Sequence, residues 1–191
     1  MLPARLVRAI DQVGVLPMVW AAGNDYEDCG RETSITCIES NQGSISVAAL
    51  DRNLMPHTYS GRGPGYCSPL QPFIGAPTFG VIPWGGGWID TKTQGAGTSS
   101  TAPLVSAALA ILKSIYPKAT NLELRTALAI SADPLGRPQS WYKDIGFGLL
   151  QVDRAIAMMP EVTKHPFYNR IREAMFAPLP PITLSDAVRD F

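Results

Sequence analysis

Residues 99–116 constrain the fold of this chain more than any other stretch, because small and apolar side chains dominate it. Val105, Leu109 and Leu112 recur at helical spacing, a pattern typical of a long buried helix. We expect Pro103 to lie in the first turn, where a proline is tolerated because its missing N–H would have no partner there anyway. A helix this apolar needs a second apolar layer to cover it.

Two short apolar runs, residues 15–22 and 44–50, can supply that second layer. The first ends at Gly23 and Asn24, and the second at the turn 51–53. Short apolar runs bounded by turn residues indicate buried strands of a parallel sheet. Briefer strand candidates lie in the stretch 55–98, which is dense in Gly and Pro, at residues 73–76 and 80–83.

Further helices are predicted around these strands, and together they indicate an α/β fold. They are expected at residues 2–13, at 122–131 with Asn121 as the cap, and at 152–158. Helices that alternate with buried strands predict a largely parallel sheet flanked by helices. We therefore expect one domain over residues 1–159. Residues 160–191, rich in Pro and charge, are interpreted as a C-terminal extension that is packed on the surface or partly mobile.

The composition argues against several classes of partner. Lys plus Arg and Asp plus Glu both total 16 in 191 residues, so no basic surface is expected for nucleic acid. No apolar run approaches the roughly 20 residues of a membrane-spanning helix, and polar residues interrupt the apolar start of the chain, so neither a membrane segment nor a leader is predicted. The three cysteines leave both the redox compartment and the localisation open.

A serine opens the long apolar helix, in the segment GTSSTAPLVSA that begins at Gly97. Backbone N–H groups in a first helical turn point toward any negative charge that develops beside it. The segment resembles the nucleophile motif of the subtilisin family of serine proteases, in which Gly-Thr-Ser opens a buried helix and a proline follows. The resemblance implies that Ser99 is the nucleophile and that Gly97 and Thr98 bind substrate, since a side chain at Gly97 would intrude on a bound peptide.

The run Ala21-Ala22-Gly23-Asn24 stands where the first strand ends, at the edge where ligands of open α/β sheets bind. It resembles the oxyanion-hole segment of the same family. The resemblance implies that Asn24 donates its side-chain amide to the tetrahedral intermediate, and that Ala21, Ala22 and Gly23 line the pocket for the substrate side chain before the cut bond. Asp25 could bias that pocket toward Arg or Lys, although an acidic residue at a loop start is more often simply solvated.

The likeness continues along the chain, over roughly residues 4–158 in the family's order. Residues 44–51, 59–64, 74–77 and 146–150 resemble successive segments of the family. The chain departs from the family at Ser100, where the family usually has Met, and at Leu104, where it has His. These changes alter packing and remove no reacting group. The implied fold is of the subtilisin type without its N-terminal strands and helices.

The family's triad runs Asp, His and then Ser along the chain, and its first two members precede the segment that resembles residues 21–24. We therefore expect the His and the Asp to come from outside this chain, from the N-terminal half of the peptidase domain. His57 is interpreted as a solvated loop residue and His165 as part of the C-terminal extension. The predicted activity is serine-type endopeptidase action on protein or peptide substrates without a cofactor, with the isolated chain almost inactive.

Several alternatives stay beside this prediction. The chain could be a non-catalytic subtilisin-like domain kept for binding or structure. A general α/β-hydrolase is disfavoured because Gly-x-Ser-x-Gly lacks its second Gly here, and a phosphate loop at 95–99 lacks the required Lys. Cys29 and Cys37 could form a disulfide or stay unpaired. Three acidic residues in one loop do not predict a calcium site, so no metal is expected; they are Asp25, Glu27 and Asp28.

Overall fold

The computed structural model describes residues 17–29, 34–35, 43–65, 70–78, 81–83, 92–94, 97–136 and 142–177. Their centre is a three-stranded parallel sheet in the order β1-β2-β3. Its strands are β1 (Val19–Ala21), β2 (Ile45–Leu50) and β3 (Ile74–Pro77). β2 is buried along its whole length, as expected for the middle strand of a parallel sheet. The helix predicted over residues 2–13 lies outside the described residues.

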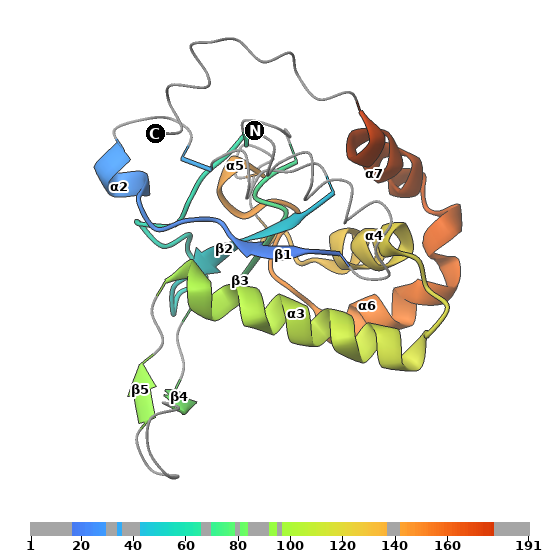
Figure 1. Cartoon of the computed structure of the whole chain (residues 1–191), viewed down its shortest axis with the longest axis horizontal. Helices are drawn as coiled ribbons and strands as arrows, with labels where there is room; N and C mark the ends of the chain where they lie inside the picture. The colour runs from blue at the N-terminus through green and yellow to red at the C-terminus, as the bar shows by residue number, and fades with distance from the viewer. Residues whose placement is uncertain are drawn as a thin grey trace.

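Helix α3 (Thr98–Ile115) packs across all three strands and forms the second layer of the core (Figure 1). Its buried face carries Val105, Ala108, Leu109 and Leu112. By length and composition alone α3 could cross a membrane, but its contacts with the sheet are those of the core helix of a globular domain. The predicted parallel sheet flanked by helices is therefore confirmed.

Pro103 lies further into α3 than the sequence suggested. It is the sixth residue of the helix, which continues through it. Because proline has no N–H, the carbonyl of Ser99 has no backbone donor from the residue four positions ahead. The prediction that Pro103 is tolerated is confirmed, while its placement in the first turn was wrong by about one turn.

Four helical segments form a cluster beside α3, in which the first contacts each of the other three (Figure 1). They are α4 (Asn121–Ser131), α6 (Val152–Met158), the 3₁₀ segment η2 (Met159–Lys164) and α7 (Pro166–Phe176). The predicted cap of α4 was one residue off. Thr120 caps the helix by accepting the N–H of Glu123, whose carboxylate accepts the N–H of Thr120 in return, so Asn121 is instead the first helical residue.

The stretch interpreted as an extension contains η2 and α7, neither of which was predicted. Val162, Ile171 and Met175 are buried, and α7 packs on α4. His165 caps α7, because its Nδ1 accepts the N–H of Phe167 at 3.2 Å. Residues 160–177 are therefore a packed helical layer of the molecule.

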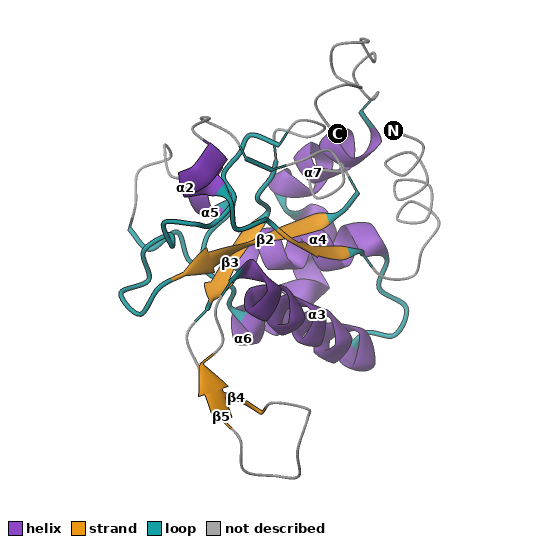
Figure 2. Ribbon diagram, turned by 60° about the vertical axis from the view of Figure 1, so that its left-hand side comes forward, coloured by secondary structure: helices purple, strands orange, loops and turns teal. Residues whose placement is uncertain are grey.

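Shorter elements complete the described structure. The predicted loop after Asn24 contains α2 (Tyr26–Cys29), and α5 (Tyr142–Ile145) lies before the turn at Gly146. The predicted strand at 80–83 corresponds to β4 (Val81–Pro83), which pairs antiparallel with β5 (Lys92–Gln94) in a hairpin apart from the parallel sheet (Figure 2).

Candidate functional site

Two segments that are distant in the sequence meet at the carboxyl edge of the parallel sheet. β1 ends at Ala21 and leads into Asn24, while α3 begins beside it at Thr98. The Thr98 N–H donates to Oδ1 of Asn24 at 2.8 Å, and the Thr98 hydroxyl lies 3.1 Å from the same oxygen and 3.3 Å from the Gly23 carbonyl. These contacts hold Asn24 beside the turn that leads into Ser99.

The hydrogen bonds to Thr98 fix which way the Asn24 amide faces. Because Oδ1 accepts from Thr98, the Nδ2 group keeps its two N–H donors for other partners. Gly97 has φ of +90°, and a Cβ added there would lie 3.3 Å from both Nδ2 and Oδ1. A side chain at position 97 would therefore be strained and would press on the amide of Asn24.

Ser99 is the second residue of α3, and its side chain is exposed. Its N–H is one of the four that a helix N-terminus leaves without an intrahelical acceptor. The neighbouring Thr98 and Thr101 are buried, and the Thr101 hydroxyl donates to the Thr98 carbonyl at 2.8 Å. The turn is thus anchored inward on both sides of an outward-facing serine.

Three further hydroxyl groups surround Gly97. Its N–H donates to the Tyr59 hydroxyl at 2.7 Å, and its carbonyl accepts from Thr78 at 3.1 Å and from Ser100 at 2.7 Å. Sequence reasoning missed Tyr59 and Thr78, which are 38 and 19 residues away from Gly97, and it treated Ser100 as a packing change. No local pattern marks a hydroxyl that meets a distant backbone group.

The predicted pocket-lining residues Ala21, Ala22 and Gly23 lie under the segment that follows Tyr59. The Gly61 N–H donates to the Gly23 carbonyl at 2.9 Å, and a Cβ at Gly61 would overlap the Ala22 carbonyl. Ala22 is buried, with 1% of its surface exposed, whereas Ala21 and Gly23 on either side of it are partly exposed. Asp25, by contrast, is exposed.

An ion pair ties the same segment to α5. Arg62 Nη1 lies 3.5 Å from Oδ1 of Asp144, and the guanidinium lies 4.2 Å from the centre of the Tyr26 ring. Burial raises the pKa of the Asp144 carboxyl above its ordinary value, an effect that the positive charges of Arg62 and Lys143 partly oppose. Arg62 therefore links the helix after Asn24 to α5.

The contacts of the two histidines, His57 and His165, do not involve Ser99. His57 is half-buried and stacks on the Tyr59 ring with 3.7 Å between ring centroids, so its interpretation as a solvated loop residue was wrong. The stacking and the hydrogen bond from its N–H to the Ala49 carbonyl at 2.8 Å draw it against the sheet. In the described part of the chain, neither His57 nor His165 is hydrogen-bonded to Ser99.

The described residues give no support for a metal site and do not test the disulfide between Cys29 and Cys37. No group of three or more His, Cys, Asp and Glu side chains gathers to hold a metal ion among the residues that the structure describes. Glu27 and Asp28 lie in the first turn of α2. Cys29 ends that helix, whereas Cys37 and Cys67 lie outside the described residues, so the possible disulfide stays untested.

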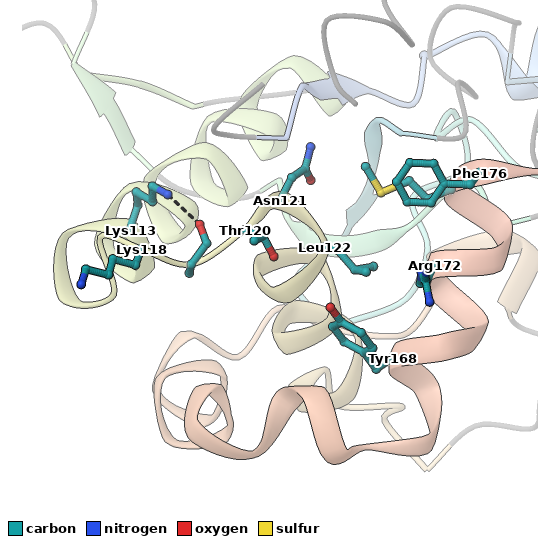
Figure 3. Close-up of a pocket in the computed structure, with 10 residues that line it drawn as sticks. Lys113, Lys118, Thr120, Asn121, Leu122, Tyr168, Arg172 and Phe176 are labelled. Atoms are coloured by element: carbon teal, nitrogen blue, oxygen red, sulfur yellow. Dashed lines mark hydrogen bonds between the residues drawn. The ribbon is translucent and has the colours of Figure 1, made fainter. Parts of the chain in front are cut away.

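A separate groove of about 510 Å³ lies between the N-terminus of α4 and helix α7 (Figure 3). None of the predicted site residues lines it. Its cationic side chains come from different elements. Lys113 lies in the last turn of α3, Lys118 in the turn that follows this helix, and Arg172 on α7. Lys113 already donates to the Ala119 carbonyl at 2.6 Å. This groove is therefore distinct from the site at Asn24 and Ser99.

Comparison with known proteins identifies the family of the chain. Residues 3–148 match the model of the subtilase family, peptidase S8. The thermostable alkaline protease of Halalkalibacterium halodurans is 31% identical over 149 residues, which are 78% of this chain and 36% of that protein. Subtilisin-like protease SBT3.11 of Arabidopsis thaliana is 33% identical over 134 residues, 64% of this chain and 18% of that protein.

Solved structures support the same fold. The prenylagaramide maturation protease PagA matches with a TM-score of 0.61 at 22% identity, over 81% of this chain and 54% of that one. Fervidolysin from Fervidobacterium pennivorans matches with a TM-score of 0.59 at 24% identity, over 81% of this chain and 24% of that one. The chain spans 11% to 36% of the lengths of the curated relatives named here and of SBT3.5 from the same plant. On the match over residues 3–148, the chain belongs to the subtilase family.

Proposed function

We propose that this chain contributes the nucleophile and the oxyanion hole of a serine endopeptidase. Ser99 attacks the scissile carbonyl, and the Asn24 side-chain amide and the Ser99 N–H donate to the oxyanion that forms. Donors fixed in advance at the place where charge develops are commonly the largest single source of rate acceleration. No cofactor is needed for this chemistry.

One observation carries the proposal: the contact between Asn24 and Thr98. Oδ1 of Asn24 accepts from Thr98 at 2.8 Å across 74 residues of sequence, so the donor end of the amide is held beside the residue that precedes Ser99. Asn24 and Ser99 are both exposed, as groups that meet a substrate must be.

The substrate contacts follow from the same placement. Ala21 and Gly23, with the buried Ala22 between them, border the pocket for the residue before the cut bond, and Gly97 and Thr98 border its other side. The exposed carboxylate of Asp25 favours Arg or Lys at that substrate position. Profiling a peptide library with the active enzyme tests this preference, and a hydrophobic or indifferent profile contradicts the role of Asp25.

The general base and its orienting carboxylate come from a second partner in this proposal, the N-terminal half of a subtilase domain. A serine hydroxyl without a base is a weak nucleophile near neutral pH. Once a histidine is supplied, it takes the Ser99 proton during attack and returns it to the leaving amine, while the aspartate orients the imidazole.

A fluorophosphonate probe, which labels activated serines, tests the proposal directly. The purified chain is treated alone and after co-folding with a subtilase N-terminal half that carries the Asp and His, and the labelled residue is found by peptide mapping. Labelling at Ser99 is expected in the co-folded sample and nearly absent in the chain alone. Strong labelling of the isolated chain contradicts an external base. A folded complex that never labels favours the non-catalytic binding domain.

A further inference from the structure

Tyr59 contacts both segments of the proposed site, although the proposed chemistry of Ser99 and Asn24 does not use it. Its hydroxyl accepts the Gly97 N–H at 2.7 Å and lies 3.1 Å from the hydroxyl of Thr78. Its backbone carbonyl accepts the N–H of Tyr26 at 3.1 Å, just beyond Asn24. One residue thus connects the turn before Ser99 with the segment that carries Asn24.

Proton counting gives the hydroxyl network a direction. Each hydroxyl has a single proton to donate. The Thr78 proton goes to the Gly97 carbonyl at 3.1 Å, so in the contact between the two hydroxyls Thr78 accepts and Tyr59 donates, while the Tyr59 oxygen accepts from the Gly97 N–H. The chain of hydrogen bonds therefore leaves Gly97 at its N–H and returns at its C=O. Hydrogen bonds linked in this way polarise and strengthen one another.

Gly97 needs such a clamp because of its own freedom. Glycine populates positive and negative φ about equally, so φ of +90° at Gly97 is one choice among several for an unrestrained chain. Gly97 is also buried, and a buried N–H without an acceptor is costly. The Tyr59 and Thr78 hydroxyls satisfy both of its polar groups in this single conformation.

The ring that delivers the Tyr59 hydroxyl is held by its own neighbours. The His57 ring stacks on it, and the His57 backbone N–H donates to the Ala49 carbonyl of β2 at 2.8 Å. The Ser60 hydroxyl accepts the Ala49 N–H at 2.9 Å. Residues on both sides of Tyr59 are therefore fixed to the buried strand, so the hydroxyl acts from a rigid base.

We infer that Tyr59 is a positioning residue: with Thr78 it holds the Gly97 peptide so that Thr98 meets Asn24 and Ser99 faces outward. Its consequence for catalysis rests on the proposed function, whereas its effect on the geometry of the turn does not. Tyr59 acts through Gly97 and need not touch the substrate.

The geometric effect can be measured in the full chain without catalysis. NMR spectra report the amides of Gly97 and Thr98 and the side-chain NH₂ of Asn24. In Tyr59→Phe, we expect Gly97 to exchange its amide hydrogen about 5-fold faster or more, because a buried N–H loses its acceptor. We also expect the Thr98 and Asn24 signals to shift. Thr78→Val removes the donor to the Gly97 carbonyl but leaves the Tyr59 acceptor in place, so it should shift the Thr98 and Asn24 signals with a smaller change in Gly97 exchange. Thr78→Ser should leave all three signals unchanged.

Tyr168→Phe is the matched control, because it removes a tyrosine hydroxyl at the distant groove. It should leave the signals of Gly97, Thr98 and Asn24 unchanged. Unchanged amide exchange in α4 shows that each variant is folded. Unchanged Thr98 and Asn24 signals in a folded Tyr59→Phe chain overturn the positioning role, whatever the catalytic outcome.

The catalytic effect is measured in the co-folded enzyme. Tyr59→Phe should lower kcat by about 10- to 100-fold, the range for displacing a reacting group from outside the chemistry, and leave KM within about twofold. The double variant with Thr78→Val should lose no more than the larger single loss, because both act on one hydrogen-bond chain. Additive losses, or a rise in KM alone, overturn the inference. A wild-type complex that does not label at Ser99 instead contradicts the proposed function.

Discussion

Asn24 shows how one side chain can serve structure and chemistry at the same time. Its carbonyl oxygen accepts from Thr98, which holds two segments together, and its NH₂ group stays available at the surface. The two ends of the amide can therefore be separated by mutation.

Asn24→Asp is the variant that separates them. A carboxylate still accepts from Thr98 but cannot donate to an oxyanion, so we expect the chain to stay folded and kcat of the co-folded enzyme to fall by roughly 10²–10³-fold, with little change in KM. This magnitude is typical for the loss of one oxyanion-hole donor, subtilisin being the reference case. Asn169→Ala, at an exposed position on α7, is the control. Equal effects on kcat and KM would indicate a packing role.

Asp144 makes the stability of the folded chain depend on pH. Burial raises the pKa of its carboxyl in the folded state, so between the ordinary value and that raised value the folded chain holds a proton that the unfolded chain has lost. Stability linked to Asp144 is therefore present at acid pH and lost as the pH rises through this window, which begins near pH ~4.

Urea unfolding at several pH values between about 4 and 7 measures this effect. Asp144→Asn should flatten the decline of stability with rising pH, since it removes the titrating group. Asp153→Asn, at an exposed position of α6, should leave the slope as it is. The same slope in the Asp144→Asn chain and the wild type would assign the pH dependence to other groups.

At the scale of elements, the sequence predicted those with a clear periodicity. The apolar face of α3, the apolar run of β2 and the helix over 152–158 were all found close to their predicted bounds. The two segments of the candidate site were marked by their own motifs. Their contact through Thr98 is set by the packing of α3 on β1, and no local pattern records it.

Helix α7 was missed because its apolar face is narrow. Ile171 and Met175 are one turn apart and fully covered, but they stand among Arg170, Arg172 and Glu173 and follow two prolines. The many charged residues and prolines therefore indicated an extension, and a single apolar i, i+4 pair was too weak a pattern to predict a helix. The capping role of Thr120 was missed for a related reason, since Asn121 is itself a common N-cap residue.

Ile171→Ala tests how firmly α7 belongs to the molecule. Ile171 is 1% exposed, and truncating a buried isoleucine costs about 2–5 kcal/mol of the free energy of unfolding. Denaturant titration should show a loss in that range, whereas Phe176→Ala at a half-exposed position should cost far less. A loss of less than ~1 kcal/mol for Ile171→Ala would mean that α7 unfolds separately from the sheet.

At the scale of the whole molecule, one side of the fold leaves apolar surface in contact with water. Leu104, Ile111 and Ile115 of α3 are 45%, 45% and 48% exposed, on the face opposite the sheet. Among the described residues, β1 has a neighbouring strand on one side alone. Large apolar patches and unpaired strand edges both favour association.

We therefore expect the isolated chain to self-associate as its concentration rises, and Ile111→Lys to reduce this association without unfolding the chain. Sedimentation velocity over a concentration series measures it. Thr163→Lys, which adds the same charge at an exposed position of η2, serves as the control. A chain that stays monomeric at all concentrations would show that this apolar face does not drive self-association.

Residues of this region should differ in how well they tolerate substitution. Gly61 lies against the backbone of Ala22, and Gly63 lies against the backbone of Gln71. Any side chain at position 61 or 63 would overlap a backbone carbonyl, so folding itself demands glycine there. Ser99 is on the surface, where many side chains fit. A saturation library scored for soluble expression alone should therefore keep glycine at positions 61 and 63 and accept many residues at position 99. A screen for hydrolysis by the co-folded enzyme should accept serine alone at position 99.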